Sequence, residues 1–97
     1  MTLPGDVRPY KRTAVFTEET VPAALRRAHA TKAGAWGLIH VVDGRLAYRI
    51  ADPRRPRSER ILTPQDEPGV VEPTILHEVE PLGPVRFFVE FHHREPG

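Results

Sequence analysis

Two histidines and one glutamate are the residues of this 97-residue sequence best placed to do chemistry. His29 lies just before a segment rich in glycine and alanine, and His77 follows Pro73 by four residues. Glu90 stands within a hydrophobic stretch, where a carboxylate is costly to bury unless it is paired or bound to a metal. Two imidazoles and one carboxylate from three strands would form an open metal site. We therefore predict that His29, His77 and Glu90 hold a divalent metal ion, either zinc, iron, manganese or nickel.

Each of these residues also has a purely structural interpretation. A histidine in a core is more often a hydrogen-bonded structural residue than a ligand. Glu90 could instead form an ion pair with Arg86 or Lys32. His92 shares the strand face of Glu90, so it is either a fourth ligand or a hydrogen-bond partner of a ligand. His40 is expected to face outward.

Three further residues are candidates for binding a small molecule beside the metal. Lys32 could hold an anionic ligand, or it could lie in a solvated turn. Trp36 is expected in the core or in the wall of a pocket. Glu72 and Lys32 are the candidates for proton transfer, although neither belongs to a recognisable catalytic motif. The sequence therefore favours binding over catalysis. The alternatives are a metal-dependent enzyme of the oxygenase or hydrolase type and a structural domain without metal.

The elements that must position these residues are expected to be short strands. Eleven prolines and seven glycines are spread along the chain, and a proline within a helix costs about 3 kcal/mol. Residues 36–42 and 45–50 are expected to pair across a type I′ turn at Asp43-Gly44. Residues 85–92 alternate so that Phe87, Val89 and Phe91 share one face, opposite Glu90 and His92.

The remaining segments complete an all-β arrangement. Residues 23–30 have high helix propensity but lack an apolar stripe to bury, so we expect a strand there. Short strands separated by turns are typical of a sandwich or a small barrel. The other expected strands cover residues 11–17, 59–63, 69–72 and 75–80.

Composition excludes several classes of protein. There is no cysteine, which excludes disulfide scaffolds and thiol catalysis. The net charge of +1 lacks the basic excess of a nucleic-acid-binding protein, and no apolar run approaches the roughly 20 residues of a membrane span. The polar segment Met1 to Tyr10 has no apolar region typical of a secretion signal. We expect a single cytoplasmic domain over residues 1–97, with a core of roughly 7–93.

Four motifs, in order, resemble a family of small cupin-like proteins related to the N-terminal domain of tellurite-resistance protein B. Residues 69–77 also resemble a degenerate second signature of the cupin barrel, and residues 36–46 resemble the end of the first signature. The resemblance covers roughly residues 4–94. The four motifs are Tyr-Lys-Arg-Thr-x-x-Phe-Thr at 10–17, His-x-Thr-Lys-x-Gly-x-Trp-Gly at 29–37, Glu-Pro-x-x-x-His at 72–77 and Gly-Pro-Val-Arg-Phe-x-Val-Glu-Phe at 83–91.

The resemblance implies a single cupin-type (jelly-roll) barrel with a metal or ligand site between the two signatures. By position, His29 and His77 resemble the two signature histidines, and Glu90 resembles a carboxylate from the late strand. Thr31 and Gly37 stand where ordinary metal cupins carry a further histidine and a glutamate. The resemblance also implies a homodimer and a role in a tellurite-type or oxidative stress response. The methyltransferase of longer relatives is a separate domain, so no methyl transfer is expected.

Overall fold

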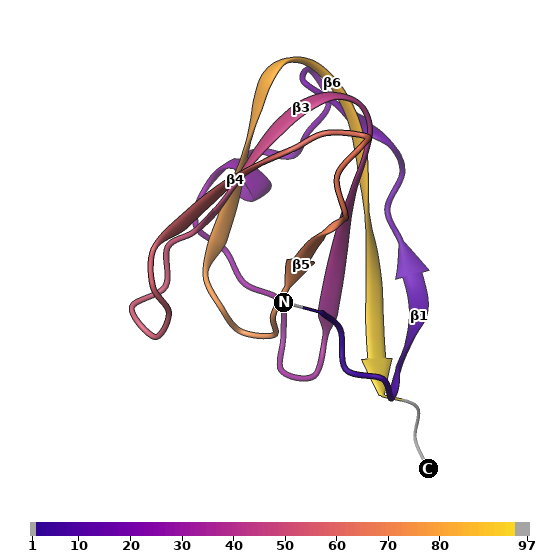
Figure 1. The fold of residues 1–97 in the computed structure, drawn as a ribbon, viewed down its shortest axis with the longest axis vertical. Coiled ribbons are helices and arrows are strands. Elements are labelled where there is room, and N and C mark those ends of the chain that lie inside the picture. Colours follow the sequence, from indigo (N-terminus) through magenta and orange to yellow (C-terminus); the bar gives the residue numbers. More distant parts are fainter. Residues whose placement is uncertain (1, 95–97) are drawn as a thin grey trace.

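Strands dominate the part of the chain that the computed structural model describes, residues 2–94 (Figure 1). Only η1 is helical, as one short segment of 3-10 helix. The structure is therefore all-β, as the sequence predicts. No helix within residues 2–94 is long and apolar enough to cross a membrane. In chain order the elements are β1 (Val7–Arg12), β2 (Phe16–Thr17), η1 (Ala23–Arg26), β3 (Trp36–Ile50), β4 (Ser58–Leu62), β5 (Gly69–Val71) and β6 (His77–Arg94).

The two longest strands, β3 and β6, form the centre of the sheet. They pair antiparallel along nearly their whole length, from Trp36 opposite His92 to Ile50 opposite His77. Strands β1 and β2 pair with β6, whereas β4 and β5 pair with β3. In Figure 1, β3 and β6 run together up one side of the molecule, bend over the top and descend on the other side. The bent sheet therefore has a concave and a convex face.

The register of β3 against β6 is interrupted at two points. The interruptions lie between Val41 and Asp43 and between Gly44 and Leu46, and such bulges bend and twist a strand. Gly44 has a φ of 81°, which a residue without a side chain adopts at little cost. The predicted type I′ turn at Asp43-Gly44 is wrong, because the residues before and after it pair with β6 and not with each other.

The other predicted strands are found with changed limits. Residues 77–80 of the predicted strand 75–80, and all of 85–92, fall within the single strand β6. The segment 11–17 contributes its first two residues to β1 and its last two to β2. The predicted strand over 23–30 is wrong, because η1 occupies its first half. The first turn of η1 is closed by the Leu25 amide, which donates to the Pro22 carbonyl at 3.0 Å. Strands β4 and β5 lie close to their expected positions.

The sheet is not closed into a barrel. Within residues 2–94 the strand order is β1-β6-β3-β4, so β1 and β4 remain as its two ends. The structure thus shows an all-β fold and does not show the specific cupin barrel that the resemblance implied. The hydrophobic core consists of Val21, Ile39, Leu46, Tyr48, Leu62, Val71, Val79, Val85 and Phe87.

Substitution of Gly44 by alanine is expected to destabilise the fold. A Cβ at Gly44 would run into the Pro84 carbonyl oxygen and lie 2.9 Å from the Val85 Cα. We expect Gly44→Ala to lower the free energy of unfolding by about 3 kcal/mol or more, measured by chemical denaturation. Gly34→Ala is the matched control, because Gly34 has a similar φ of 83° and no heavy atom within 4 Å of its Cβ position. Equal losses in the two variants would contradict a role for close packing at the bend.

Candidate functional site

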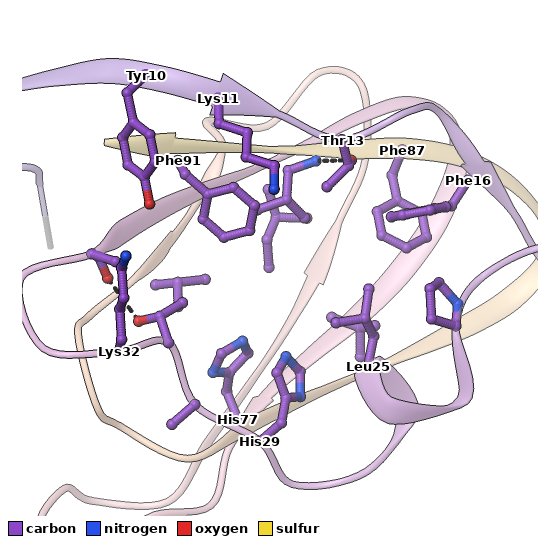
Figure 2. A pocket seen from close by; sticks show the side chains of 18 residues that line it. Tyr10, Lys11, Thr13, Phe16, Leu25, His29, Lys32, His77, Phe87 and Phe91 are labelled. Carbon is purple, nitrogen blue, oxygen red and sulfur yellow. Dashed lines mark hydrogen bonds between the residues drawn. The ribbon is translucent and has the colours of Figure 1, made fainter. Parts of the chain in front are cut away.

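A cavity of about 550 Å³ lies against the concave face of the sheet (Figure 2). It is bounded by β1, β3, β5 and β6 and by the segment from β2 to β3 that includes η1. Its volume falls in the range of small-molecule sites. Most of the lining is apolar, with Phe16, Pro22, Leu25, Ala30, Ala35, Ile39, Val71, Val79, Phe87, Val89 and Phe91.

The polar part of the cavity lining is basic. Lys11, Lys32, His29 and His77 contribute to it, together with Tyr10 and two threonines. Lys11 and Lys32 are the only lysines of the chain. No carboxylate belongs to the lining in the described part of the chain, and the ion pairs found there do not include either lysine. The cavity therefore offers positive charge without an internal counter-charge.

His29 and His77 lie side by side in the cavity wall. Their backbones form a reciprocal pair, in which the His29 amide donates to the His77 carbonyl at 2.9 Å and the His77 amide donates back at 2.8 Å. The ring centroids are 4.1 Å apart with a tilt of 53°. In Figure 2 both rings point into the cavity. The structure thus brings together the two histidines that the sequence singled out, although they are distant along the chain.

Asp52 fixes the backbone that leads into His77. Its side chain is almost fully buried and accepts hydrogen bonds from the Leu76 amide at 2.9 Å and from the Arg54 amide at 2.8 Å. The Arg54 guanidinium also donates to it, at 2.9 and 3.0 Å. The hydrogen bonds from the Arg54 side chain, followed by those from the two amides, hold the pKa of Asp52 well below its usual range. This charged anchor holds the loop after β3 against the start of β6.

Burial keeps the His77 imidazole neutral. The residue is only 5% exposed, and desolvation lowers its pKa from 6.5 to about 4. The hydrogen bond to the Ile75 carbonyl acts in the opposite direction, while nearby His29 lowers the pKa further. His77 is therefore an uncharged cavity residue at neutral pH.

Glu90 does not join the two histidines. Phe87, Val89 and Phe91 line the cavity, so the alternation of β6 places Glu90 on the convex face. There its Oε1 accepts a hydrogen bond from His92 Nε2 at 2.8 Å, and His40 Nε2 lies 3.9 Å away.

The predicted metal triad of His29, His77 and Glu90 is consequently not assembled. His92 lies with Glu90 and not with the two cavity histidines. Among the residues that the structure describes, no group of three or more histidine, cysteine, aspartate or glutamate side chains could hold a metal ion.

Trp36 and Glu72 also lie outside the cavity lining, whereas Lys32 belongs to it. Trp36 is opposite His92 in the β3–β6 register, so it shares the convex face with His92. The Glu72 carboxylate forms an ion pair with Arg55. Neither residue is positioned to contact a ligand in this cavity.

Sequence reasoning missed Tyr10, Lys11 and Thr13 in the wall contributed by β1 and the residues after it. Lys11 reaches the cavity because it pairs opposite Phe91 across β1 and β6, and Thr13 is held there by two hydrogen bonds to Val89, at 2.9 and 3.0 Å. These pairings join segments at opposite ends of the chain. Two signals were available: the motif at 10–17 contains all three residues, and both lysines of the sequence lie at the cavity.

The model of the TehB-like domain matches residues 11–89, which is most of the chain. The chain belongs to the TehB-like domain family. The relation to tellurite-resistance protein B that the motifs indicated is therefore confirmed, whereas membership of a cupin-like family is not.

Relatives of this TehB-like chain come from Haemophilus influenzae. It is 35% identical over 74 residues to a probable S-adenosyl-L-methionine-dependent methyltransferase TehB of strain ATCC 51907, a match covering 75% of this chain and 26% of the relative. It is 34% identical, with the same coverage, to the protein of that name from strain 10810. The chain thus spans about a quarter of the length of these relatives.

Two crystal structures share the fold of the TehB-like chain. Haemophilus influenzae TehB superposes with a TM-score of 0.84 at 28% identity, covering 93% of this chain and 32% of TehB. A protein from Escherichia coli strain K12 superposes with a TM-score of 0.86 at 18% identity, covering 99% of both chains. At that identity the second likeness concerns the fold alone.

These comparisons overturn the prediction of a metal-binding cupin. The relatives are named probable S-adenosyl-L-methionine-dependent methyltransferases, which points to a methyltransferase-related domain and not to a metal-binding cupin. The predicted divalent metal and the metal-dependent oxygenase or hydrolase were therefore wrong. The physical reason is the alternation of β6, which separates Glu90 from the cavity histidines.

The cavity residues do not fit S-adenosylmethionine itself. That cofactor carries a sulfonium cation, which would lie in a cavity with Lys11 and Lys32 and no carboxylate in the described lining. A carboxylate is also the usual partner of a nucleoside ribose in dinucleotide sites. We therefore derive no methyl-transfer step within this cavity.

The burial of His77 predicts a pH-dependent stability. The unfolded chain binds a proton on this residue below a pH of about 6.5, whereas the folded chain does so only near pH 4. Stability contributed by neutral His77 is therefore present at pH 7 and is lost as the pH falls. Between pH 7 and pH 4.5 we expect a loss of roughly 2 kcal/mol in the free energy of unfolding, measured with urea.

The variant His77→Gln is expected to lose this part of the pH dependence, and His93→Gln is the control that retains it. If the free energy of unfolding of His77→Gln fell with pH as steeply as that of the unsubstituted protein, burial of His77 would not be the origin of the pH dependence.

Proposed function

We propose that this chain is a small-molecule-binding domain whose cavity takes an organic anion with an apolar body. The observation that carries the proposal is a mainly apolar cavity that holds both lysines of the chain and no carboxylate among its described lining residues. An organic acid supplies the complementary chemistry, because its carboxylate pairs with the lysines and its hydrocarbon part contacts the aromatic and aliphatic wall.

The apolar wall supports binding of a compact hydrophobic group. Phe16 and Phe87 pack edge to face with ring centroids 5.7 Å apart, and Phe91 and Val89 extend the same wall along β6. Removing about 100 Å² of ligand surface from water contributes roughly 2.5 kcal/mol. This hydrophobic contribution is the same for charged and neutral ligands of the same shape, so it provides affinity but no selectivity between them.

The lysines support selection of an anion. Lys11 comes from β1 and Lys32 from the segment before β3, so the two cations reach the cavity from separate elements (Figure 2). Both residues are exposed, and an ion pair at such a site contributes about 0.5–1 kcal/mol. Together the two lysines favour a carboxylate over a neutral group of the same shape.

Neutralising the lysines is expected to weaken the binding of an aromatic acid. With benzoate as the probe and heteronuclear NMR titration as the measurement, we expect Lys11→Gln and Lys32→Gln each to raise the Kd about threefold, and the double variant about tenfold. Arg57→Gln is the charge-matched control, since Arg57 is exposed and outside the cavity lining. Benzyl alcohol, which lacks the charge, should bind all variants alike. Equal effects of the lysine and Arg57 substitutions would contradict the proposal.

Filling the cavity is expected to abolish binding without unfolding the chain. Val89 is half-buried in the cavity wall, so Val89→Phe places additional ring atoms where a ligand would lie. We expect the Kd for benzoate to rise at least tenfold, with a change in Tm of only a few degrees. Val42→Phe adds the same volume at a position 46% exposed and serves as the control. Undiminished binding by a folded Val89→Phe variant would place the ligand elsewhere.

A further inference from the structure

The two cavity histidines each have one ring nitrogen committed to the backbone. His29 Nδ1 lies 2.9 Å from the Arg27 carbonyl oxygen, and His77 Nδ1 lies 3.1 Å from the Ile75 carbonyl oxygen. A carbonyl oxygen only accepts hydrogen bonds, so Nδ1 must be the donor in both pairs. In a neutral imidazole the proton on Nδ1 leaves Nε2 with a free lone pair. Both Nε2 atoms are therefore acceptors.

These two acceptors cannot satisfy each other. The rings are 4.1 Å apart at their centroids and point into the same cavity (Figure 2). Across the described residues, the hydrogen bonds of both rings are those to the Arg27 and Ile75 carbonyls. A ligand group that donates a hydrogen bond is therefore favoured next to the two Nε2 atoms, whereas a ligand group that only accepts is disfavoured there.

The histidines and Lys11 come from opposite walls of the cavity. Figure 2 shows Lys11 on the strand at one side and the His29–His77 pair on the other. The neutral state of buried His77 keeps this wall an acceptor over the physiological pH range. The cavity thus presents the positive charge of Lys11 on one wall and two hydrogen-bond acceptors on the opposite wall.

From this arrangement we propose that the cavity selects organic anions that carry a hydroxyl or N–H group at the end remote from the carboxylate. The inference deepens the proposed binding function and rests on it. The carboxylate pairs with Lys11, the apolar body crosses the aromatic wall, and the remote donor reaches Nε2 of His29 or His77. Phenolic acids are the simplest compounds that have all three features.

Matched pairs of acids test the proposal. We would measure Kd by NMR titration at pH 8 for 4-hydroxybenzoate against benzoate, and for 3-(4-hydroxyphenyl)propanoate against 3-phenylpropanoate. The second pair places the hydroxyl farther from the carboxylate. In at least one pair the hydroxylated acid is expected to bind about tenfold more tightly. The corresponding methoxy acids, which accept but do not donate, should bind no better than the unsubstituted acids.

Variants then locate the origin of the preference. His77→Phe and His29→Phe remove the acceptors and keep the aromatic shape, so either should reduce the tenfold preference severalfold while benzoate still binds. His93→Phe is the control outside the cavity lining, and it should keep the preference. A preference that survived in folded His29→Phe and His77→Phe would overturn the proposal.

The outcomes separate this inference from the function on which it rests. If benzoate binds in a lysine-dependent manner and neither hydroxylated acid is preferred, the donor-selecting role of the histidines is overturned and the anion-binding function stands. If none of the acids binds, both are overturned. The comparison of hydroxylated with unsubstituted acids needs no variant, so that result does not depend on a substituted chain folding correctly.

Discussion

The antiparallel pairing of β3 with β6 is the interaction on which every other feature of this molecule depends. It joins Trp36 to His92 at one end and Ile50 to His77 at the other, so it fixes the sheet on both sides of the bend. The bulges beside Gly44 allow the long pair to curve. A flat sheet would expose Phe87 and Val89 to water, whereas the curved one surrounds them with β1, β5 and the η1 segment. The cavity is thus a consequence of strand curvature.

Alternation along β6 could be predicted from the sequence, and it decides which residues share the cavity. Phe87, Val89 and Phe91 lie on one face as the pattern indicated, and Glu90 and His92 lie on the other. The metal hypothesis conflicted with this pattern, because a carboxylate on the convex face cannot meet imidazoles on the concave face. Local periodicity was therefore a better guide to the site than the types of residue that might ligate a metal.

Long-range pairing could not be read from local signals. The reciprocal hydrogen bonds of His29 and His77 join distant segments. The residue types and the family resemblance both suggested that the two side chains meet, but no local pattern predicted this backbone pairing. Asp43-Gly44 carries the local signature of a turn, yet β6 is present as a partner on both sides and keeps the strand continuous. Lys11 reaches the cavity only through β1 pairing with β6. In each case a tertiary contact outweighs the local preference.

The distribution of basic residues makes the cavity chemically distinct from the rest of the surface. The chain's two lysines both lie at the cavity. Apart from the histidines, every other basic side chain is an arginine. Reagents that acylate primary amines would therefore modify side chains at this one location, apart from the α-amino group. A bound acid would shield the same ammonium groups from such a reagent. Because these two residues are lysines and not arginines, the cavity has side-chain amines that can be acylated. The extent of acylation therefore reports whether the cavity is occupied, without a label on the chain.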